Sequence, residues 1–279
     1  MDIGSLKQFL KNHGLRPNFT YGQNFLVDEF VLRDIVDAAE VGRQDIVLEI
    51  GPGIGNLTRE LAERAKFLLS VEKDPKFFPV LRSIKKDYPK NFRFEVSDFL
   101  EFDFVAALKN YAGENFKYKV VANIPYYITG KILQQLMYAS VKPETITILT
   151  QKEVARNICA KAGDLSVLAI SVQLFGAPKL VQVVQAKSFY PAPKVDSAIL
   201  QISLDKKPKV ELADEKKFFK IVKACFAGKR KQIHNTLVNN LRLDKNYVLQ
   251  VLTELKIKPT ARPQELSIQD WARLAEKIS

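Results

Sequence analysis

Cysteine and histidine are nearly absent from this chain of 279 residues, which contains two of each. The cysteines, Cys159 and Cys225, are far apart and form no Cys-x-x-Cys pair, which excludes a disulfide framework and a cysteine-based zinc site. Two histidines are too few for a histidine-rich metal site, so we expect no metal. No apolar run approaches the roughly 20 residues that a membrane span needs, and the N-terminus lacks the basic-then-apolar order of a signal peptide. We therefore expect a cytoplasmic protein without a membrane partner.

Acidic residues are outnumbered, and the imbalance is concentrated near the C-terminus. The chain has 43 Lys and Arg residues against 31 Asp and Glu residues, a net charge of +12. Residues 206–279 hold 17 basic and 8 acidic residues, so three quarters of the excess lies in the last quarter of the chain. A solubility charge would explain a modest excess, but this asymmetry favours a polyanionic partner such as nucleic acid.

Apolar runs of strand length alternate with amphipathic stretches over the first two thirds of the sequence. Seven candidate strands cover residues 46–50, 67–71, 92–96, 118–122, 145–150, 180–186 and 198–204. The candidate helices cover residues 6–11, 30–39, 57–65, 75–86, 104–109, 128–138, 152–160 and 165–175. This alternation predicts an α/β fold with a mostly parallel, seven-stranded sheet that is covered on both faces.

The hydrophobic pattern changes after Leu204. A polar junction with a proline, at residues 206–209, is followed by helical periodicity alone. We therefore predict two domains, one at residues 1–205 and a small, basic, all-helical one at residues 206–279. Lys229, Arg230 and Lys231 form the densest basic cluster of the second domain, and we expect them to contact the phosphates of a nucleic acid.

A glycine-rich turn follows the first candidate strand and is the sharpest local signal. After Glu49, the glycines Gly51, Gly53 and Gly55 have the spacing G-x-G-x-G at the start of a candidate helix. Glycines let the backbone bend sharply here and approach a ligand closely. The dinucleotide fingerprint would need a glycine at position 56, where Asn56 stands, which disfavours an NAD-dependent oxidoreductase. A purely structural turn is the remaining alternative.

Acidic side chains end the next two candidate strands. Glu72 follows Gly51 by 21 residues, a spacing at which an acidic group accepts both hydrogen bonds of a ribose diol. Asp98 follows the third strand and lies beside the same predicted crevice, where it could bind an adenine amine. Surface acids at strand ends are the alternative, but the spacing from the glycine turn favours a nucleoside site.

The fourth candidate strand ends in an amide, a proline-stiffened turn and an aromatic ring, at residues 123–126. The amide oxygen of Asn123 and nearby backbone carbonyls can accept hydrogen bonds from an exocyclic amine. Tyr126 offers a face on which a base can stack. A turn with a core aromatic is the alternative.

Together, these motifs resemble those of the S-adenosylmethionine-dependent amino-methyltransferases. Four further stretches are GQNFL at 22–26, QKEVA at 151–155, LSV at 165–167 and FYPAPKVDS at 189–197. With them, the sequence resembles the small-subunit ribosomal RNA adenine dimethyltransferases, the kasugamycin-resistance methyltransferase family, over about residues 20–240. One departure is GKRKQ at 228–232, where that family commonly has a run of arginines; the positive charge is kept.

This resemblance implies a Rossmann-like class I methyltransferase domain that uses S-adenosylmethionine. The implied reaction forms dimethyladenosine at two adjacent adenines in a hairpin loop near the 3′ end of small-subunit, 16S-type ribosomal RNA, within a pre-30S-type particle. We expect a monomer. The implied cofactor residues are Asn24, Leu26, Glu49, Gly51, Gly53, Gly55, Glu72, Asp98 and Asn123. The implied residues at the target base are Asn123, Ile124, Pro125, Tyr126 and Phe189, with Phe189 sandwiching the flipped adenine against Tyr126.

Two alternatives share the same scaffold. A large-subunit RNA methyltransferase of the macrolide-resistance type has the same Asn-x-Pro-Tyr signature. The continuation at 126–129, the run at 193–197 and the longer basic tail favour the small-subunit enzyme. A non-catalytic ribosome-assembly factor would show an eroded cofactor motif, whereas every cofactor position is intact in this sequence.

Overall fold

The computed structural model describes residues 3–228 and 230–278 and forms two compact units. The first unit contains the chain up to Ala155 together with Pro178–Leu204, and the second contains Arg156–Ala177 together with the chain from Asp205 onward. One of these divisions, between Leu204 and Asp205, lies one residue before the predicted boundary. Residues 156–177 group instead with the C-terminal helices, to which the backbone of this segment is hydrogen-bonded. The assignment of separate functions to two domains stays a prediction.

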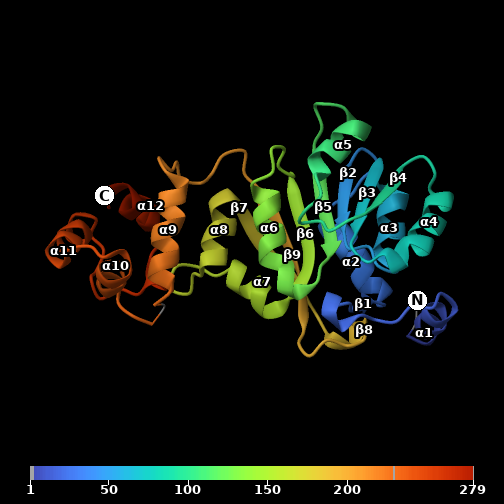
Figure 1. The fold of residues 1–279 in the computed structure, drawn as a ribbon, viewed down its shortest axis with the longest axis horizontal. Coiled ribbons are helices and arrows are strands. Elements are labelled where there is room, and N and C mark those ends of the chain that lie inside the picture. Colours follow the sequence, from blue (N-terminus) through green and yellow to red (C-terminus); the bar gives the residue numbers. More distant parts are fainter. Residues whose placement is uncertain (1–2, 229, 279) are drawn as a thin grey trace. The chain divides into compact units, whose positions relative to one another are not determined.

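A seven-stranded sheet lies at the centre of the first unit, and its strands are side by side in Figure 1. They are β2 (Ile46–Ile50), β3 (Phe67–Glu72), β4 (Phe92–Val96), β5 (Tyr118–Asn123), β6 (Thr145–Gln151), β7 (Gly176–Val184) and β9 (Ser197–Leu204). The order is β4-β3-β2-β5-β6-β9-β7; the first five strands are parallel and β9 is antiparallel to β6. The predicted α/β fold with a mostly parallel, seven-stranded sheet is therefore confirmed.

The strand order reverses between β2 and β5. The chain passes from β2 outward through β3 to β4 and then returns to place β5 on the other side of β2. In open α/β sheets, ligands bind at such a switch point, beyond the carboxyl ends of the strands. The ends of β2, β3 and β5 therefore define where a site should lie.

Helices cover the sheet of the first unit, because successive residues of a strand point to opposite faces and the residues on both faces are apolar. On β2, for example, Val47 and Leu48 point to opposite faces and neither is exposed to solvent. Around the sheet lie α1 (Ile3–Asn12), α2 (Glu29–Ala38), α3 (Asn56–Arg64), α4 (Phe78–Asp87), α5 (Phe104–Ala112) and α6 (Thr129–Met137), followed by α7 (Lys152–Ile158). Aspartates begin two of these helices: Asp28 accepts backbone N–H bonds from Phe30 and Val31, and Asp103 accepts one from Ala106.

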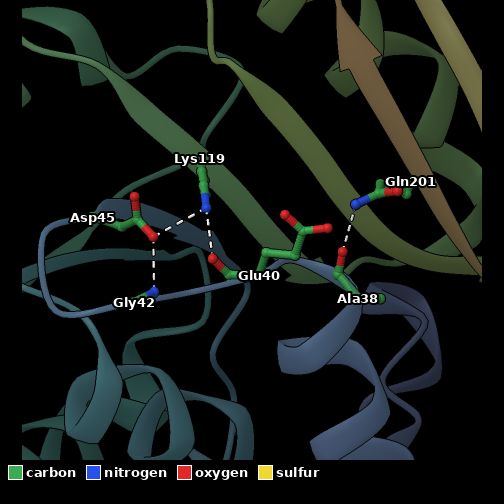
Figure 2. A network of polar contacts seen from close by, with 6 residues as sticks. All are labelled: Ala38, Glu40, Gly42, Asp45, Lys119 and Gln201. Carbon is green, nitrogen blue, oxygen red and sulfur yellow. Dashed lines mark hydrogen bonds and ion pairs between the residues drawn. The ribbon is translucent and has the colours of Figure 1, made fainter.

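A polar network fixes the loop between α2 and β2 (Figure 2). The ammonium of Lys119 on β5 donates to the Glu40 carbonyl at 2.6 Å and contacts the Asp45 carboxylate at 3.0 Å. The same carboxylate accepts the Gly42 N–H at 2.7 Å, and Gln201 on β9 donates to the Ala38 carbonyl at the end of α2. These contacts lie at the amino ends of β2 and β5, so they hold the scaffold at the edge opposite to the expected site.

A second, two-stranded sheet was not predicted from the sequence. Strand β1 (Phe25–Leu26) pairs antiparallel with β8 (Phe189–Tyr190), so that Phe25 is opposite Tyr190 and Leu26 is opposite Phe189. The backbone N–H of Val27 continues the pairing with a 3.0 Å bond to the Ser188 carbonyl. Short 3₁₀ turns flank this sheet at Phe19–Tyr21 and Ala186–Ser188. The pairing brings together two of the stretches that carry the family resemblance.

The second unit is helical, as its periodicity predicts. It contains α8 (Val167–Phe175), α9 (Glu215–Phe226), α10 (Ile233–Leu241), α11 (Lys245–Glu254) and α12 (Ile268–Lys277). Trp271 and Phe218 are fully buried in it, and the ring of Trp271 lies 5.8 Å from that of Phe226. The Gln264 carbonyl accepts the N–H groups of Gly163 and Leu165, which attaches the segment before α8 to this unit. In the described part of the chain, no helix has the length and apolar character needed to cross a membrane.

Candidate cofactor and base site

A cavity of about 1070 Å³, open mouth included, lies at the carboxyl ends of β2, β3 and β5. Five segments that are distant in the sequence form most of its wall, namely residues 21–26, 49–54, 71–73, 98–99 and 123–128. The glycine turn, the acidic residues Glu72 and Asp98 at the strand ends and the turn at residues 123–126 all contribute to this wall. Of the residues predicted for the cofactor and the target base, two, Gly55 and Phe189, do not line the cavity.

The glycine turn bends through backbone conformations that residues with a side chain rarely adopt. Gly51 has φ +69°, and a Cβ placed on it would lie 3.9 Å from the Asn123 carbonyl, on the next strand of the sheet. Gly55 has φ +80°, and a Cβ there would lie 2.1 Å from the Ile84 side chain on α4. The structure thus assigns Gly55 a packing constraint between α3 and α4, whereas Gly51 and Gly53 belong to the cavity wall.

Glu49, at the end of β2, is a buried acid in the cavity wall and only 1% exposed. Its Oε2 accepts a 2.5 Å bond from the Ser70 hydroxyl on β3, and its Oε1 has no hydrogen-bond partner among the described residues. Burial raises the pKa of this carboxyl to about 7, although the Ser70 hydroxyl opposes the rise. A cationic ligand would supply the charge partner that this carboxylate lacks.

Glu72, at the end of β3, is held by two backbone N–H groups. Its Oε2 accepts from Gly53 at 2.9 Å and its Oε1 accepts from Asp74 at 2.8 Å. Burial raises the pKa of Glu72, and these two bonds oppose the increase. An ionised carboxylate has about four acceptor positions, so both oxygens retain capacity for the hydroxyls of a ribose.

Asp98 lies beyond β4 and is paired with a lysine that the sequence analysis did not single out. Its Oδ2 lies 2.6 Å from the Lys73 ammonium, and its Oδ1 accepts the Leu100 N–H at 3.0 Å. The hydrogen bond with Lys73 lowers the pKa of Asp98, which keeps this side chain an acceptor. Lys73 also lies 6.0 Å from the centre of the Tyr21 ring. Its position directly after Glu72 was the available sequence signal.

The Asn123 amide ends β5 and is oriented by the N-terminal segment. Its Nδ2 donates to the Asn24 carbonyl at 3.2 Å, which identifies the donor end of the amide and leaves Oδ1 to accept. Ile124 and Pro125 continue the cavity wall. The half-buried Tyr126 follows them, and its hydroxyl lies 2.7 Å from the Ser197 hydroxyl on β9. Burial raises the pKa of Tyr126, so the phenol is neutral at physiological pH.

Phe189 does not occupy the position that the resemblance implies. Its ring is 1% exposed and belongs to the hydrophobic core, because β8 directs it inward beside β1. In this structure the ring does not line the cavity, and a stacking contact with a base would require it to leave this core. Its role in base capture stays a prediction.

The basic cluster belongs to the second unit. Lys229 lies outside the described residues, and Arg230 and Lys231 are exposed just before Gln232, the N-cap of α10. Their contact with RNA stays a prediction. Among residues 3–228 and 230–278, no three His, Cys, Asp or Glu side chains form a group that could hold a metal ion.

Comparison with known proteins identifies the family. The model of the ribosomal RNA adenine dimethylase family matches residues 14–279. The chain belongs to the ribosomal RNA adenine dimethylase family. Dimethylases of this family are enzymes that take methyl groups from S-adenosylmethionine, so the predicted enzyme class, cofactor and reaction on ribosomal RNA adenine are confirmed.

Curated relatives of this dimethylase match it over nearly its whole length. A protein named ribosomal RNA small subunit methyltransferase A from Dehalococcoides mccartyi is 40% identical over 272 residues, which cover 98% of this chain and 92% of the relative. Proteins of the same name from Clostridium botulinum and Streptococcus thermophilus are 37% and 38% identical, over 98% and 99% of this chain and 98% and 97% of their own.

Two solved structures share the fold of this dimethylase. A dimethyladenosine transferase from Plasmodium falciparum superposes with a TM-score of 0.75 at 27% identity, over 90% of this chain and 95% of its own. The 23S rRNA methyltransferase ErmE gives a TM-score of 0.69 at 31% identity, over 91% of this chain and 99% of its own. The fold of this chain is therefore shared with an enzyme named for dimethyladenosine and with one named for 23S ribosomal RNA.

Proposed function

We propose that this dimethylase modifies the N6 amines of two adjacent adenines in a hairpin loop near the 3′ end of small-subunit ribosomal RNA. It would act in the cytoplasm, as a monomer, on a pre-30S-type particle during small-subunit assembly. The observation that carries the proposal is the Asn123 amide, whose donor end is held by the Asn24 carbonyl at 3.2 Å. Asn123 lines the same cavity as the three acidic residues Glu49, Glu72 and Asp98.

The donor set fits S-adenosylmethionine. Glu49 offers a buried, partly unpartnered carboxylate to the positively charged part of the cofactor. Glu72 would accept the ribose hydroxyls, and Asp98 would accept the adenine amine. Gly51 and Gly53 would let the cofactor approach the backbone closely, with Asn24 and Leu26 bordering its methionine end. When bound, the cofactor supplies a methyl group that is already strongly electrophilic.

The adenine amine is the poor reactant, because its lone pair is delocalised into the ring. Asn123 Oδ1 and the carbonyl of Ile124 or Pro125 would accept its two N–H bonds. This arrangement favours a pyramidal nitrogen and stabilises the positive charge that develops on it. Tyr126 would hold the flipped base by stacking, and the amine proton leaves to water after the transfer.

The likeness to ErmE means that the fold does not separate a small-subunit target from a large-subunit one. The curated relatives at 37–40% identity, all named for the small subunit, favour the small-subunit target. The test is to incubate the protein and labelled S-adenosylmethionine with small-subunit particles that lack the modification, and in parallel with large-subunit particles. Mass spectrometry of the digested RNA should find dimethyladenosine near the 3′ end of the small-subunit RNA.

Label found only in the large-subunit RNA would establish the macrolide-resistance type of activity. A protein that binds the particle but not the cofactor would instead be an assembly factor on the same scaffold.

A further inference from the structure

The N-terminal strap, which we define as residues 18–26, forms one side of the cavity and is attached to three separate motifs. Asn123 donates to the Asn24 carbonyl at 3.2 Å, and Asn56 on α3 donates to the Leu26 carbonyl at 3.0 Å. The third attachment is made by Gln23, whose Nε2 donates to Asp74 Oδ2 at 3.1 Å. The first two attachments use the backbone of the strap, so Gln23 is the strap side chain that makes the third.

Gln23 uses its amide in two directions. Its Oε1 accepts the Asn18 N–H at 2.8 Å, and the backbone N–H of Gln23 donates to the Asn18 carbonyl. These two bonds close the turn at residues 18–23. Its Nε2 reaches 51 residues along the chain to Asp74. The first contact is local and would serve any tight turn, whereas the second connects the strap to the sheet.

Asp74 is a connection to the ribose-binding acid. It is 4% exposed, and its Oδ1 accepts the Lys76 N–H at 3.1 Å, which leaves Oδ2 for Gln23. Its own N–H donates to Glu72 Oε1 at 2.8 Å. The Gln23 amide is therefore two hydrogen bonds away from the carboxylate that is expected to hold the cofactor ribose.

We propose that Gln23 is a positioning residue that latches the strap onto the Asp74–Glu72 edge and thereby fixes the Asn24 carbonyl that orients Asn123. This inference rests on the proposed function, because it makes cofactor binding and the orientation of the methyl-accepting site depend on one amide. Loss of the latch frees the strap between residues 18 and 24. The Asn24 carbonyl is then no longer held in place to accept the hydrogen bond from Asn123 Nδ2. Both the affinity for the cofactor and the rate at saturating cofactor should fall.

The substitution Gln23→Glu removes the hydrogen bond to Asp74 and keeps the hydrogen bond from the Asn18 N–H within the turn. A glutamate keeps an acceptor for the Asn18 N–H but presents a second carboxylate to Asp74 in place of a donor. We expect the Kd for S-adenosylmethionine, measured by titration calorimetry without RNA, to rise at least about tenfold, because hydrogen bonds to charged groups carry effects of that order. At saturating cofactor, kcat on unmodified particles should also fall by about tenfold.

The paired substitution Gln23→Glu with Asp74→Asn reverses the polarity of the latch. The amide introduced by Asp74→Asn would donate to the new glutamate, and its side-chain oxygen would still accept the Lys76 N–H. The Kd should return to within about threefold of the unsubstituted protein. Gln23→Met, which keeps the length and adds no charge, should reproduce the loss. Gln8→Glu provides the matched control, since Gln8 is exposed on α1 and its side chain contacts Asn12.

An unchanged Kd for Gln23→Glu and Gln23→Met would overturn the proposal, as would a reversed pair that binds no better than Gln23→Glu alone. A raised Kd with an unchanged kcat at saturating cofactor would overturn the link to Asn123. The calorimetric measurement involves no RNA. A protein that binds the cofactor but methylates no adenine would therefore contradict the proposed function and leave the latch result valid.

Discussion

Glu49→Gln should stabilise the cofactor-free protein, and the gain should depend on pH. The folded protein keeps a proton on Glu49 up to a pKa of about 7, whereas the ordinary value for this side chain is 4.5. Between these two values the unfolded chain has lost the proton and the folded chain retains it. The free energy of unfolding therefore decreases as the pH rises through this window. Glutamine does not titrate and escapes this loss.

The size of the effect follows from burial. The difference between the two pKa values corresponds to about 3 kcal/mol, at 1.36 kcal/mol per pH unit, and the carboxyl is fully buried, so solvent does not screen it. Between pH 5 and pH 8, the stability of the Glu49→Gln variant relative to the unsubstituted protein should increase by roughly 2–3 kcal/mol. At roughly 2–4 °C per kcal/mol, the melting temperature of the variant relative to the unsubstituted protein should rise by about 4–12 °C between pH 5 and pH 8.

Circular dichroism melts of both proteins at pH 5, 6, 7 and 8 measure this effect. Trp271, the only tryptophan of the sequence, belongs to the second unit, so its fluorescence does not report on the surroundings of Glu49. Glu101→Gln removes the same charge from an exposed position and is the matched control. A stability difference between the Glu49→Gln variant and the unsubstituted protein that is equal at pH 5 and pH 8 would refute the reasoning.

Four further predictions concern the reaction, the fold and the RNA. Asn123→Ala should lower turnover about 10²–10³-fold and should weaken RNA binding far less, because it removes an acceptor aimed at developing charge; single-turnover kinetics and RNA-binding titrations check this. Tyr126→Ala should weaken base capture by roughly 1–3 kcal/mol, measured as KM for RNA. Phe189→Ala should instead destabilise the fold by about 3–5 kcal/mol, seen in denaturation, because its ring is in the core. Replacing the basic residues 229–231 with glutamine should reduce the salt dependence of RNA binding by a slope of about 0.7–0.9 per phosphate contact and leave cofactor affinity unchanged.

Local patterns were sufficient to predict the sheet and most of the site. Strands such as Ile46–Ile50 are short apolar runs bounded by turns, and their bounds agree with the prediction. The residues at the ends of parallel strands share one edge of the sheet, which is why the sequence alone places Glu49, Glu72, Asp98 and Asn123 together.

Contacts between distant segments were beyond the reach of those patterns. The two-residue strands β1 and β8 are too short to show a period, so their pairing and the inward direction of Phe189 had no signal. The bond between Gln23 and Asp74 joins two polar residues that look like ordinary turn residues in the sequence. The segment 156–177 follows the strand–helix alternation of the first unit, yet its hydrogen bonds to Gln264 place it in the second.

The β1–β8 sheet also bears on how the protein is made. The Ser188 hydroxyl and the Asp28 carboxylate beside this sheet are 160 residues apart in the chain. At about 5–20 residues per second, a ribosome needs roughly 10–30 s to synthesise that interval. During this time, a nascent chain can complete all five parallel strands while β1, at the end of the strap, still lacks its partner strand β8. The segment that forms one side of the cavity therefore gains its partner strand late in translation, long after it has itself been synthesised.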